Sequence, residues 1–484
     1  MKTDLKRLFE PRHVAVLGAS PVKSPGRYTQ LEWLTQAKYP GRLYPVNPRY
    51  KEVGGYKCYP GLADIPGEVD MAIMMLPAEK VVQVLREIPA GKLKFAVVIT
   101  SGFSEVGEVK LEKELVAVAR AKGTRILGPN CMGIYSLNGR VLQVPDQTFD
   151  SEPGTIGGVA QSGGLAINFM RASINSGLTY QASVSIGNQC DINLEECLEW
   201  FYRDDDVHVI TAYVEDLKQG PHFKELARRV SLKKPLIIWK GGITDQGARA
   251  ANSHTGALAI PSNVWQGLIR QTGIIPADHL FDVIQISRAF EWEVLPRGTG
   301  VGVLTSGGGG SVYMTDRMVR GGLDIPLLSG PVRRKLSELI ASVNTIIDNP
   351  IDLGAASYLP DVVGDTITTM ARDEAIHSIV FYLYLNFFEP EREKIGPLIS
   401  KLAEIRKAVE IPIYVALYRA HHHFDDIDNT RREAVDLLNK LRIPYFMDLE
   451  SSVMAIRRLY EYHRFLAGHG AADGDKKGRP SRGK

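Results

Sequence analysis

A histidine surrounded by small residues is the first candidate for chemistry in this chain. His254 lies in residues 252–258, N-S-H-T-G-A-L, after a predicted strand over residues 235–240 and a glycine-containing loop over residues 241–249. Such neighbours let the backbone move or approach an anion closely, and they leave the imidazole little apolar packing to do. A lone histidine in such a loop is most commonly an ordinary surface residue, but an imidazole can also act as a nucleophile near neutral pH. Which of the two applies depends on the groups that the rest of the chain brings to it.

One carboxylate is placed to act on that histidine. Glu215 follows a predicted strand over residues 207–214, in Y-V-E-D-L, and the next strand leads to His254. A carboxylate bound to one ring nitrogen fixes the tautomer and leaves the other nitrogen available as a nucleophile. The adjacent Asp216 is expected to point the other way. Glu215 is therefore a candidate orienting residue, although an acid at a strand end is also compatible with an ordinary structural role.

A turn with two glycines is a candidate anion site. Residues 161–165, Q-S-G-G-L, connect a predicted strand to a predicted helix. The backbone N–H groups of Ser162, Gly163 and Gly164 would point at an anion there, and the helix dipole would contribute ~0.3–1 kcal/mol. Taken alone, the segment is equally compatible with a tight turn that binds nothing.

Three loops of small residues follow predicted strands in the first part of the chain. They are residues 18–20 with the nearby Gly26-Arg27, residues 101–105 (S-G-F-S-E) and residues 128–133 (G-P-N-C-M-G). Loops at the carboxyl ends of parallel strands line the ligand crevice, so the three are expected to face one site. The strand over residues 43–46 ends in Asn47-Pro48, without the acid that holds the ribose of NAD, which disfavours dinucleotide binding. A different phosphorylated ligand is predicted.

The loops described above connect short apolar strands to helices. Strands and helices alternate along the chain in three successive blocks, which predicts an α/β fold of parallel, doubly wound sheets. Predicted helices cover residues 81–88, 108–122 and approximately 389–409. The three domains are predicted at residues 1–143, 144–296 and 297–467, and residues 468–484 are predicted to be a disordered tail. The predicted strands cover residues 13–17, 43–46, 71–76, 95–100, 125–127, 155–160, 182–186, 207–214, 235–240, 301–305, 379–385 and 413–417.

The composition excludes several classes of protein. The chain has 484 residues, 44% of them hydrophobic and 23% charged, and a formal net charge of +3, which indicates a globular protein of about three domains and gives no sign of nucleic-acid binding. Four cysteines without a C-x-x-C pair, and the lack of a membrane-length apolar run, favour a cytoplasmic protein without membrane association. No Walker A motif occurs, and the cluster of His421, His422 and His423 with Asp425 and Asp426 lacks the spacing of a tetrahedral metal site. No metal site is predicted.

The order of these motifs resembles a known family. V-A-V-L-G-A-S, Y-P-V-N-P, S-G-F-S-E, G-P-N-C-M-G, Q-S-G-G-L, G-N-Q-C-D, V-E-D-L, N-S-H-T-G-A-L and N-P-I-D-L occur in sequence up to about residue 465. As an ordered set they are similar to the NDP-forming acyl-CoA synthetases, which are related to succinyl-CoA synthetase, and in particular to their alpha-subunit portion. The resemblance implies a Rossmann-like CoA-binding domain followed by two flavodoxin-like CoA-ligase domains.

The resemblance also implies roles for individual residues. His254 matches the phosphorylated histidine, Glu215 the acid that orients it, and Ser162, Gly163 and Gly164 the helix N-terminus that holds phosphate. The implied reaction converts acyl-CoA and phosphate into an acyl phosphate and CoA, after which His254 carries the phosphoryl group to ADP. The residues in stretches that would bind CoA are Gly18, Ser20, Gly26, Arg27, Asn47, Pro77, Ser101, Gly102, Phe103 and Asn130.

The resemblance further implies a partner chain. No segment resembles an ATP-grasp nucleotide domain, so a beta subunit carrying that domain, with ADP or ATP and Mg²⁺, is expected, possibly in an α2β2 assembly. Two residues of the phosphate loop depart from the family pattern: Ala160 replaces an expected serine, and Gly164 replaces a common alanine. The sequence leaves open the carboxylic acid, the choice of ADP or GDP, and the direction of the reaction. The alternatives are a non-catalytic CoA-binding regulatory protein of the same fold and, less favoured, an NAD-type oxidoreductase.

Overall fold

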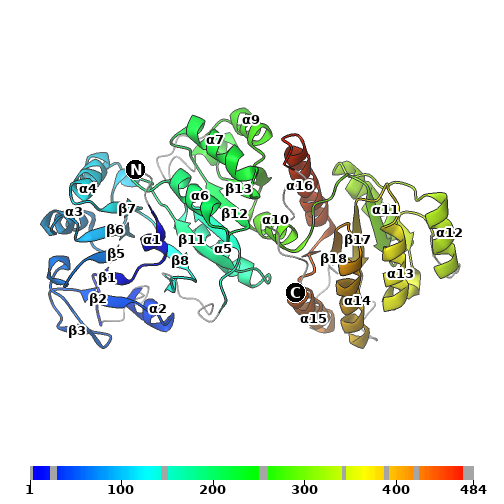
Figure 1. The fold of residues 1–484 in the computed structure, drawn as a ribbon, viewed down its shortest axis with the longest axis horizontal. Helices are drawn as coiled ribbons and strands as arrows, with labels where there is room; N and C mark the ends of the chain where they lie inside the picture. Colours follow the sequence, from blue (N-terminus) through cyan, green and yellow to red (C-terminus); the bar gives the residue numbers. More distant parts are fainter. Residues whose placement is uncertain are drawn as a thin grey trace. The chain divides into compact units, whose positions relative to one another are not determined.

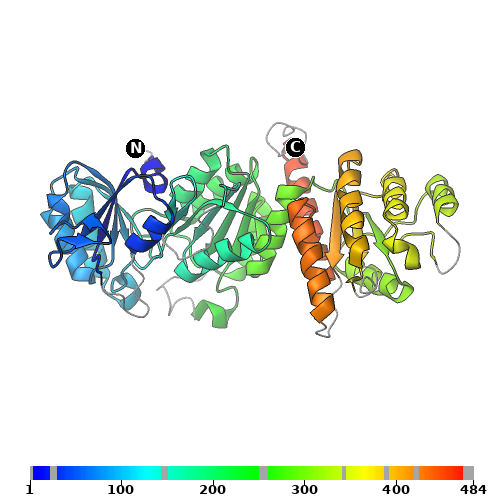
Figure 2. The same cartoon turned by 90° about the horizontal axis from the view of Figure 1, so that it is seen from below.

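The computed structural model describes residues 4–21, 30–142, 151–249, 260–340, 345–385, 392–417 and 425–471. The chain forms two compact units, Met1–Leu280 and Phe281–Lys484. The first unit contains two large sheets and the second unit contains one (Figures 1 and 2). The predicted α/β class with several parallel sheets is confirmed.

The first sheet has five parallel strands in the order β2-β1-β5-β6-β7. Its faces are covered by different helices, because alternate side chains of each strand point to opposite faces. Val14 and Val16 pack with the buried residues of α1 and α2 on one face. Ala15 and Leu17 pack with the buried residues of α3 and α4 on the other. The elements are α1 (Lys6–Phe9), β1 (His13–Leu17), α2 (Gln30–Gln36), β2 (Arg42–Val46), β5 (Val69–Met74), α3 (Ala78–Glu87), β6 (Leu93–Val98), α4 (Val109–Ala121) and β7 (Arg125–Leu127), with a small hairpin of β3 (Glu52–Val53) and β4 (Tyr56–Lys57).

The second sheet has seven strands in the order β14-β13-β12-β10-β11-β8-β9. Five are parallel, but β8 runs antiparallel to β11, and β9 antiparallel to β8. The elements are β8 (Ile134–Ser136), β9 (Val141–Leu142), β10 (Ile156–Ala160), α5 (Gly163–Ile174), β11 (Tyr180–Ser185), α6 (Leu194–Arg203), β12 (Val209–Val214), α7 (Gly220–Ser231), β13 (Leu236–Lys240), α9 (Ser262–Thr272) and β14 (Ile275–Ala277).

The antiparallel pair differs from the purely parallel arrangement that the sequence predicts. The four-residue connection between β8 and β9 is too short for a parallel crossover, which needs a dozen or more residues, so the pair forms a hairpin. Both strands fall within the predicted first domain, yet they extend the second sheet. One hydrophobic core runs through both sheets, from Leu8 and Val16 to Val184 and Phe201.

The second unit contains a five-stranded parallel sheet in the order β16-β15-β17-β18-β19. Its elements are α10 (Leu280–Trp292), β15 (Val301–Thr305), α11 (Gly308–Arg320), α12 (Gly330–Leu339), β16 (Ile351–Asp352), α13 (Pro360–Met370), β17 (Ser378–Leu383), α14 (Ile395–Ala408), β18 (Ile413–Leu417), α15 (Asp425–Lys440), β19 (Tyr445–Phe446) and α16 (Leu449–Ala467).

The residues after α10 are anchored to this third sheet. The buried carboxylate of Glu293 accepts hydrogen bonds from Arg406 Nε, at 2.8 Å, and from the backbone N–H of Ile413, at 3.2 Å. Residues 281–296, which fall in the predicted second domain, therefore belong to the second unit. The residue bounds of the three predicted domains stay a prediction. Within the described ranges, no helix combines the length and the hydropathy needed to cross a membrane.

Candidate functional site

The carboxyl ends of the first sheet's strands bring the predicted CoA-binding loops to one edge. The backbone N–H of Gly18, after β1, donates to the carbonyl of Val46 at 3.1 Å. Asn47, after β2, donates from its Nδ2 to the carbonyl of Ala19 at 2.8 Å. Asn47 thus joins two loops, where a dinucleotide-binding protein would instead present an acid to ribose.

The loops after β5, β6 and β7 meet at the same edge. Gly18 has a φ of +82°, and a Cβ at this position would lie 3.1 Å from the carbonyl oxygen of Met75. Gly102 has a φ of +111°, and a Cβ at this position would lie 3.4 Å from Cβ of Ala78, which follows Pro77 at the start of α3. The backbone N–H of Asn130 donates to the carbonyl of Thr100 at 3.0 Å. The loops that follow the five strands therefore lie at one edge of the sheet, because the carboxyl ends of parallel strands all lie on the same side.

The predicted CoA-binding residues at this edge differ in accessibility. Gly18, Pro77 and Ser101 are exposed, and Ser20, Asn47, Gly102 and Asn130 are partly buried. Phe103 is fully buried in the core beneath α3 and α4, so neither its side chain nor its backbone is accessible to a ligand in this structure. Gly26 and Arg27 lie outside the described residues.

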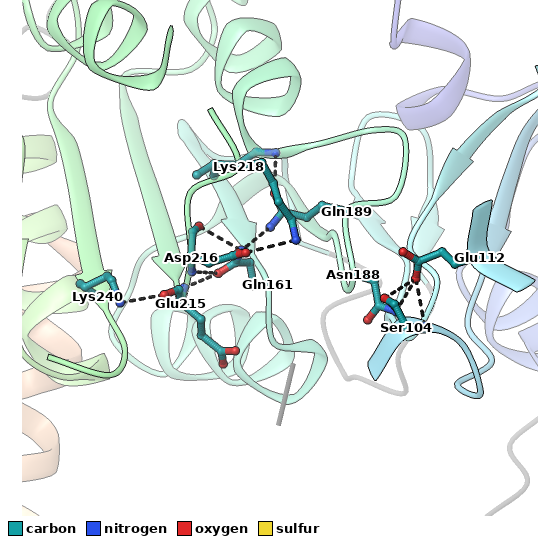
Figure 3. Close-up of polar contacts among 10 residues, drawn as sticks. Ser104, Glu112, Gln161, Asn188, Gln189, Glu215, Asp216, Lys218 and Lys240 are labelled. Atoms are coloured by element: carbon teal, nitrogen blue, oxygen red, sulfur yellow. Dashed lines mark hydrogen bonds and ion pairs between the residues drawn. The ribbon is translucent and has the colours of Figure 1, made fainter. Parts of the chain in front are cut away.

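A polar junction connects this edge to the second sheet (Figure 3). Asn188, in the loop after β11, donates from Nδ2 to Glu112 Oε2 at 2.8 Å and to Ser104 Oγ at 3.2 Å, and also to Glu105. Its backbone N–H donates to the carbonyl of Pro129 at 3.0 Å. Burial opposes the charge on Glu105, but the hydrogen bonds from Asn188 and from nearby backbone N–H groups outweigh it and lower the pKa of this carboxyl.

Glycine is required beside this junction. Gly187 has a φ of +52°, and a Cβ there would lie 2.1 Å from the carbonyl oxygen of Pro129. The sequence indicated this loop only through the motif G-N-Q-C-D and assigned it no role. The structure shows that the motif joins the loop after β7 to the loop after β11.

The predicted phosphate loop is the N-terminus of α5. Ser162 is the N-cap, and its Oγ accepts from the backbone N–H of Leu165 at 3.5 Å. A Cβ on Gly163 would lie 2.4 Å from Met132 Cγ, whereas no atom lies within 4 Å of a Cβ on Gly164. Close approach thus requires glycine at 163 but not at 164, which explains why alanine is compatible with the second position.

Gln161 ties this loop to the end of β12 (Figure 3). Its Oε1 accepts from the backbone N–H groups of both Glu215 and Asp216, the latter at 3.1 Å. Its Nε2 donates to the carboxylate of Asp216 and, at 3.2 Å, to the carbonyl of the same residue. Gln161 therefore satisfies two backbone donors at a strand end, a role that the Q-S-G-G-L pattern did not predict.

Glu215 and Asp216 direct their carboxyl groups differently, as the sequence predicted (Figure 3). Glu215 has a relative exposure of 4%, and its Oε1 accepts from the hydroxyl of Tyr213 at 3.1 Å. Asp216 faces Gln161, Gln189 at 3.3 Å and Lys218 at 3.2 Å. Burial, together with the charge of Glu215, raises the pKa of Tyr213 well above its usual range, so that hydroxyl stays a proton donor.

Lys240, at the end of β13, is a further charged group that the sequence did not indicate. Its Nζ donates to the backbone carbonyl of Glu215 at 2.8 Å and to that of Gly241. Burial lowers the pKa of Lys240, although the nearby charges of Glu215 and Asp216 partly offset the effect. Lys240 thus fixes the start of the loop that leads to residues 241–249.

His254 lies outside the described residues, so its contact with Glu215 stays a prediction. The preceding strand nevertheless ends beside Glu215. Val214 and Lys240 are register partners in the parallel pair of β12 and β13, and Gly241 donates its backbone N–H to the carbonyl of Val214 at 2.9 Å. The chain therefore leaves β13 at the edge of the sheet that carries Glu215.

Among the residues that the structure describes, no group of three or more His, Cys, Asp or Glu side chains could hold a metal ion. The histidine cluster, His421 to His423 with the side chains of Asp425 and Asp426, lies outside the described part of the structure.

Two family models match the chain. A CoA binding domain matches residues 12–136, and a succinyl-CoA ligase like flavodoxin domain matches residues 153–290. These ranges contain the converging loops of the first sheet and the region of Gln161 and Glu215, respectively.

Whole-chain relatives extend the match. The alpha subunit of acetate–CoA ligase [ADP-forming] I of Pyrococcus furiosus is 34% identical over 477 residues, which is 96% of this chain and 99% of that subunit. Acetate–CoA ligase [ADP-forming] I of Archaeoglobus fulgidus is 30% identical over 96% of this chain, but the match spans only 64% of that longer protein. A solved structure of acetyl-coenzyme A synthetase 1 of Ca. Korarchaeum cryptofilum, in complex with phosphate and ADP, has 31% identity and a TM-score of 0.83, covering 98% of this chain and 100% of that one. The ordered motifs, the two matching domain models and these relatives all agree. The chain belongs to the NDP-forming acyl-CoA synthetases, a family of acid–thiol ligases, and corresponds to their alpha-subunit portion.

Proposed function

We propose that this chain is the alpha subunit of an enzyme that interconverts acyl-CoA, ADP and phosphate with a carboxylic acid, CoA and ATP. The observation that carries the proposal is the position of Glu215. It is a buried acid at the end of β12, and Gln161, which holds it, directly precedes the N-cap of α5. The strand that precedes His254 in the sequence, β13, ends at the same sheet edge. The site thus combines an anion-binding helix end with an acid able to orient an imidazole.

The chemistry divides into two transfers. Phosphate attacks the thioester carbonyl of acyl-CoA, the C–S bond breaks, and CoA leaves as the thiol while an acyl phosphate forms. An imidazole nitrogen of His254 then attacks phosphorus, and the carboxylate leaves as the P–O bond breaks. The phosphoryl group passes from His254 to ADP to give ATP. A histidine carrier suits distant sites, since it replaces one long transfer by two short ones.

Residues of this chain have distinct roles in the proposal. The first-turn N–H groups of α5, starting at Gly163, stabilise the charge of phosphate and of the acyl phosphate. Glu215 accepts from one ring nitrogen of His254 and keeps the other nitrogen unprotonated for attack. The loops around Gly18, Asn47, Gly102 and Asn130 would hold CoA, whose phosphates suit small residues and backbone N–H groups at strand ends.

ADP and Mg²⁺ are assigned to a separate ATP-grasp beta subunit. The match to nearly the full length of an alpha subunit, together with partial coverage of a longer relative, supports this division.

Radiolabel transfer tests the proposal. The chain is incubated with [³²P]phosphate and a panel of acyl-CoAs with acetyl, branched, aromatic and dicarboxylic acyl groups, and wild type is compared with His254→Asn. Acid-labile label on wild type alone is the expected result, and the preferred thioester identifies the acid. Absence of label with every thioester, in a chain that binds CoA and with a copurifying ATP-grasp subunit present, would instead favour a non-catalytic CoA-binding protein.

A further inference from the structure

The hydroxyl of Tyr213 holds the side chain of Glu215, whereas two other residues hold its main chain. Gln161 accepts from the backbone N–H of Glu215, and Lys240 donates to its backbone carbonyl at 2.8 Å (Figure 3). Tyr213, in β12, instead donates from Oη to the carboxylate oxygen Oε1 at 3.1 Å. The position of the carboxylate therefore depends on Tyr213.

Tyr213 is itself held by aromatic packing. Its ring packs edge-on against Trp239 of β13, with centroids 4.9 Å apart and an interplanar angle of 70°. Trp239 in turn packs edge-on against Phe169 of α5, with centroids 6.3 Å apart and an angle of 78°. Edge-to-face pairs with centroids ~4.5–7 Å apart are favourable. The three rings connect α5, whose first turn is proposed to bind phosphate, to the strand that ends beside Glu215.

Gly241 leaves room for the hydroxyl of Tyr213. A Cβ at Gly241 would lie 2.4 Å from Oη of Tyr213, closer than such atoms approach in proteins. The backbone N–H of Gly241 donates to the carbonyl of Val214 at 2.9 Å, which keeps the glycine beside the end of β12. The hydroxyl can lie against Glu215 because the residue that follows β13 has no side chain.

A hydrogen bond to one carboxylate oxygen restricts rotation of the whole group. Fixing Oε1 of Glu215 also fixes the direction of the second oxygen, which in the proposed function accepts from the imidazole of His254. An O–H···O⁻ bond is charge-assisted and stronger than a neutral one, which suits this task. Reacting groups need such support, because a displacement of about 1 Å can lower a rate about 10²-fold.

We propose that Tyr213 is a positioning residue for phosphoryl transfer, which acts through Glu215 by fixing the carboxylate that orients His254. The inference rests on the proposed function, since it concerns the histidine step of that reaction. Tyr213→Phe removes the hydroxyl and keeps the ring, so the contact with Trp239 is retained.

Phosphohistidine labelling of the full chain tests the inference. The chain is mixed with [³²P]phosphate and the acyl-CoA that gives wild type the most label. At saturating acyl-CoA, Tyr213→Phe should label about tenfold more slowly, because a charge-assisted hydrogen bond is lost. The acyl-CoA concentration that gives half the maximal rate should change less than about twofold, since CoA is proposed to bind at the edge of the first sheet.

Tyr180→Phe is the matched control. Tyr180 is the first residue of β11, and its hydroxyl lies 2.9 Å from Oγ1 of Thr211, in a buried hydrogen bond of the same sheet. The control removes a comparable hydroxyl at the opposite end of the strands, so it should change the labelling rate less than about twofold. Thermal unfolding of both variants checks that each remains folded.

A second background separates positioning from a general loss of structure. In Glu215→Ala, which has no carboxylate to hold, adding Tyr213→Phe should lower the labelling rate less than about twofold further. If the double variant does not fold, the half-saturating acyl-CoA concentration of Tyr213→Phe decides, and a rise in it as large as the fall in rate would contradict the inference.

Three further results would overturn the inference while leaving the proposed function intact. They are a wild-type labelling rate in Tyr213→Phe, an undiminished effect of that substitution in the Glu215→Ala background, and an equal loss of labelling in Tyr180→Phe. A wild-type chain that takes no label from any thioester would instead overturn the proposed function, and the inference with it.

Discussion

The side-chain carbonyl of Gln161 accepts a hydrogen bond from the backbone N–H of Glu215, which joins the end of β10 to the end of β12. The same oxygen accepts from Asp216, so a single amide positions the two acids that follow the strand. Because Ser162, the next residue, caps α5, the acid and the helix end proposed to bind phosphate are held in one arrangement.

Replacing Gln161 by methionine should therefore reduce phosphorylation of His254 more than it reduces CoA binding. Two buried backbone donors would lose their acceptor, at a cost of about 1–3 kcal/mol each, and Glu215 would be less well positioned. Labelling rates, CoA affinity and urea unfolding measure the three effects. Gln189→Met is the matched control, since the side chain of Gln189 donates to the carboxylate of Asp216, at 3.3 Å. Equal losses of labelling in both variants would contradict a specific role for Gln161.

Glu215→Gln should lower the rate of His254 phosphorylation by about 10²-fold or more, because the neutral amide stabilises the imidazole charge and tautomer less well. The variant keeps an acceptor for the hydroxyl of Tyr213, so folding should be retained. Quench-flow labelling with acyl phosphate measures the rate, and far-UV circular dichroism checks the fold. A wild-type rate in this variant would remove Glu215 from the proposed mechanism.

The two glycines of the proposed phosphate loop, Gly163 and Gly164, should respond in opposite ways to substitution by alanine. Gly164→Ala should leave labelling intact and stabilise the chain by up to about 1 kcal/mol, since the site is open and alanine favours helix. Gly163→Ala should lower both stability and labelling, because its Cβ would collide with Met132. Thermal unfolding and phosphate-dependent labelling of the pair test this contrast. If both variants behave alike, the close approach of Met132 is not what requires glycine at 163.

Asn188→Ala should destabilise the junction between the two sheets of the first unit in a pH-dependent way. The hydrogen bond from Asn188 contributes to the lowered pKa of Glu105, and a lowered folded-state pKa stabilises the fold above the unfolded pKa. The stability difference between wild type and variant should then be largest near neutral pH and should shrink as the pH falls through the lowered folded-state pKa of Glu105. Urea unfolding across a series of acidic to neutral pH values measures it, and a difference independent of pH would show that Glu105 contributes nothing to it.

Local patterns were sufficient for most of the fold. β1, β7, β15 and β18 begin and end at the predicted residues, because short apolar runs bounded by glycine, proline or polar residues define buried parallel strands without reference to distant segments. The same patterns predicted which loops would meet at the edge of the first sheet, since all carboxyl ends of parallel strands lie on one side. The short strands β14, β16 and β19 were not predicted, because two or three residues carry too little periodicity to be recognised.

The sequence by itself thus determined the α/β class, the family and the set of loops that carry the candidate chemistry. Only the tertiary structure decided that β8 and β9 extend the second sheet, that Asn188 joins two sheets and that Gln161 holds Glu215. The reason is physical: strand propensity and turn chemistry act between neighbours in the chain, whereas a hydrogen bond between Gln161 and Glu215 spans 54 residues and forms only where packing of the core brings the two strand ends together.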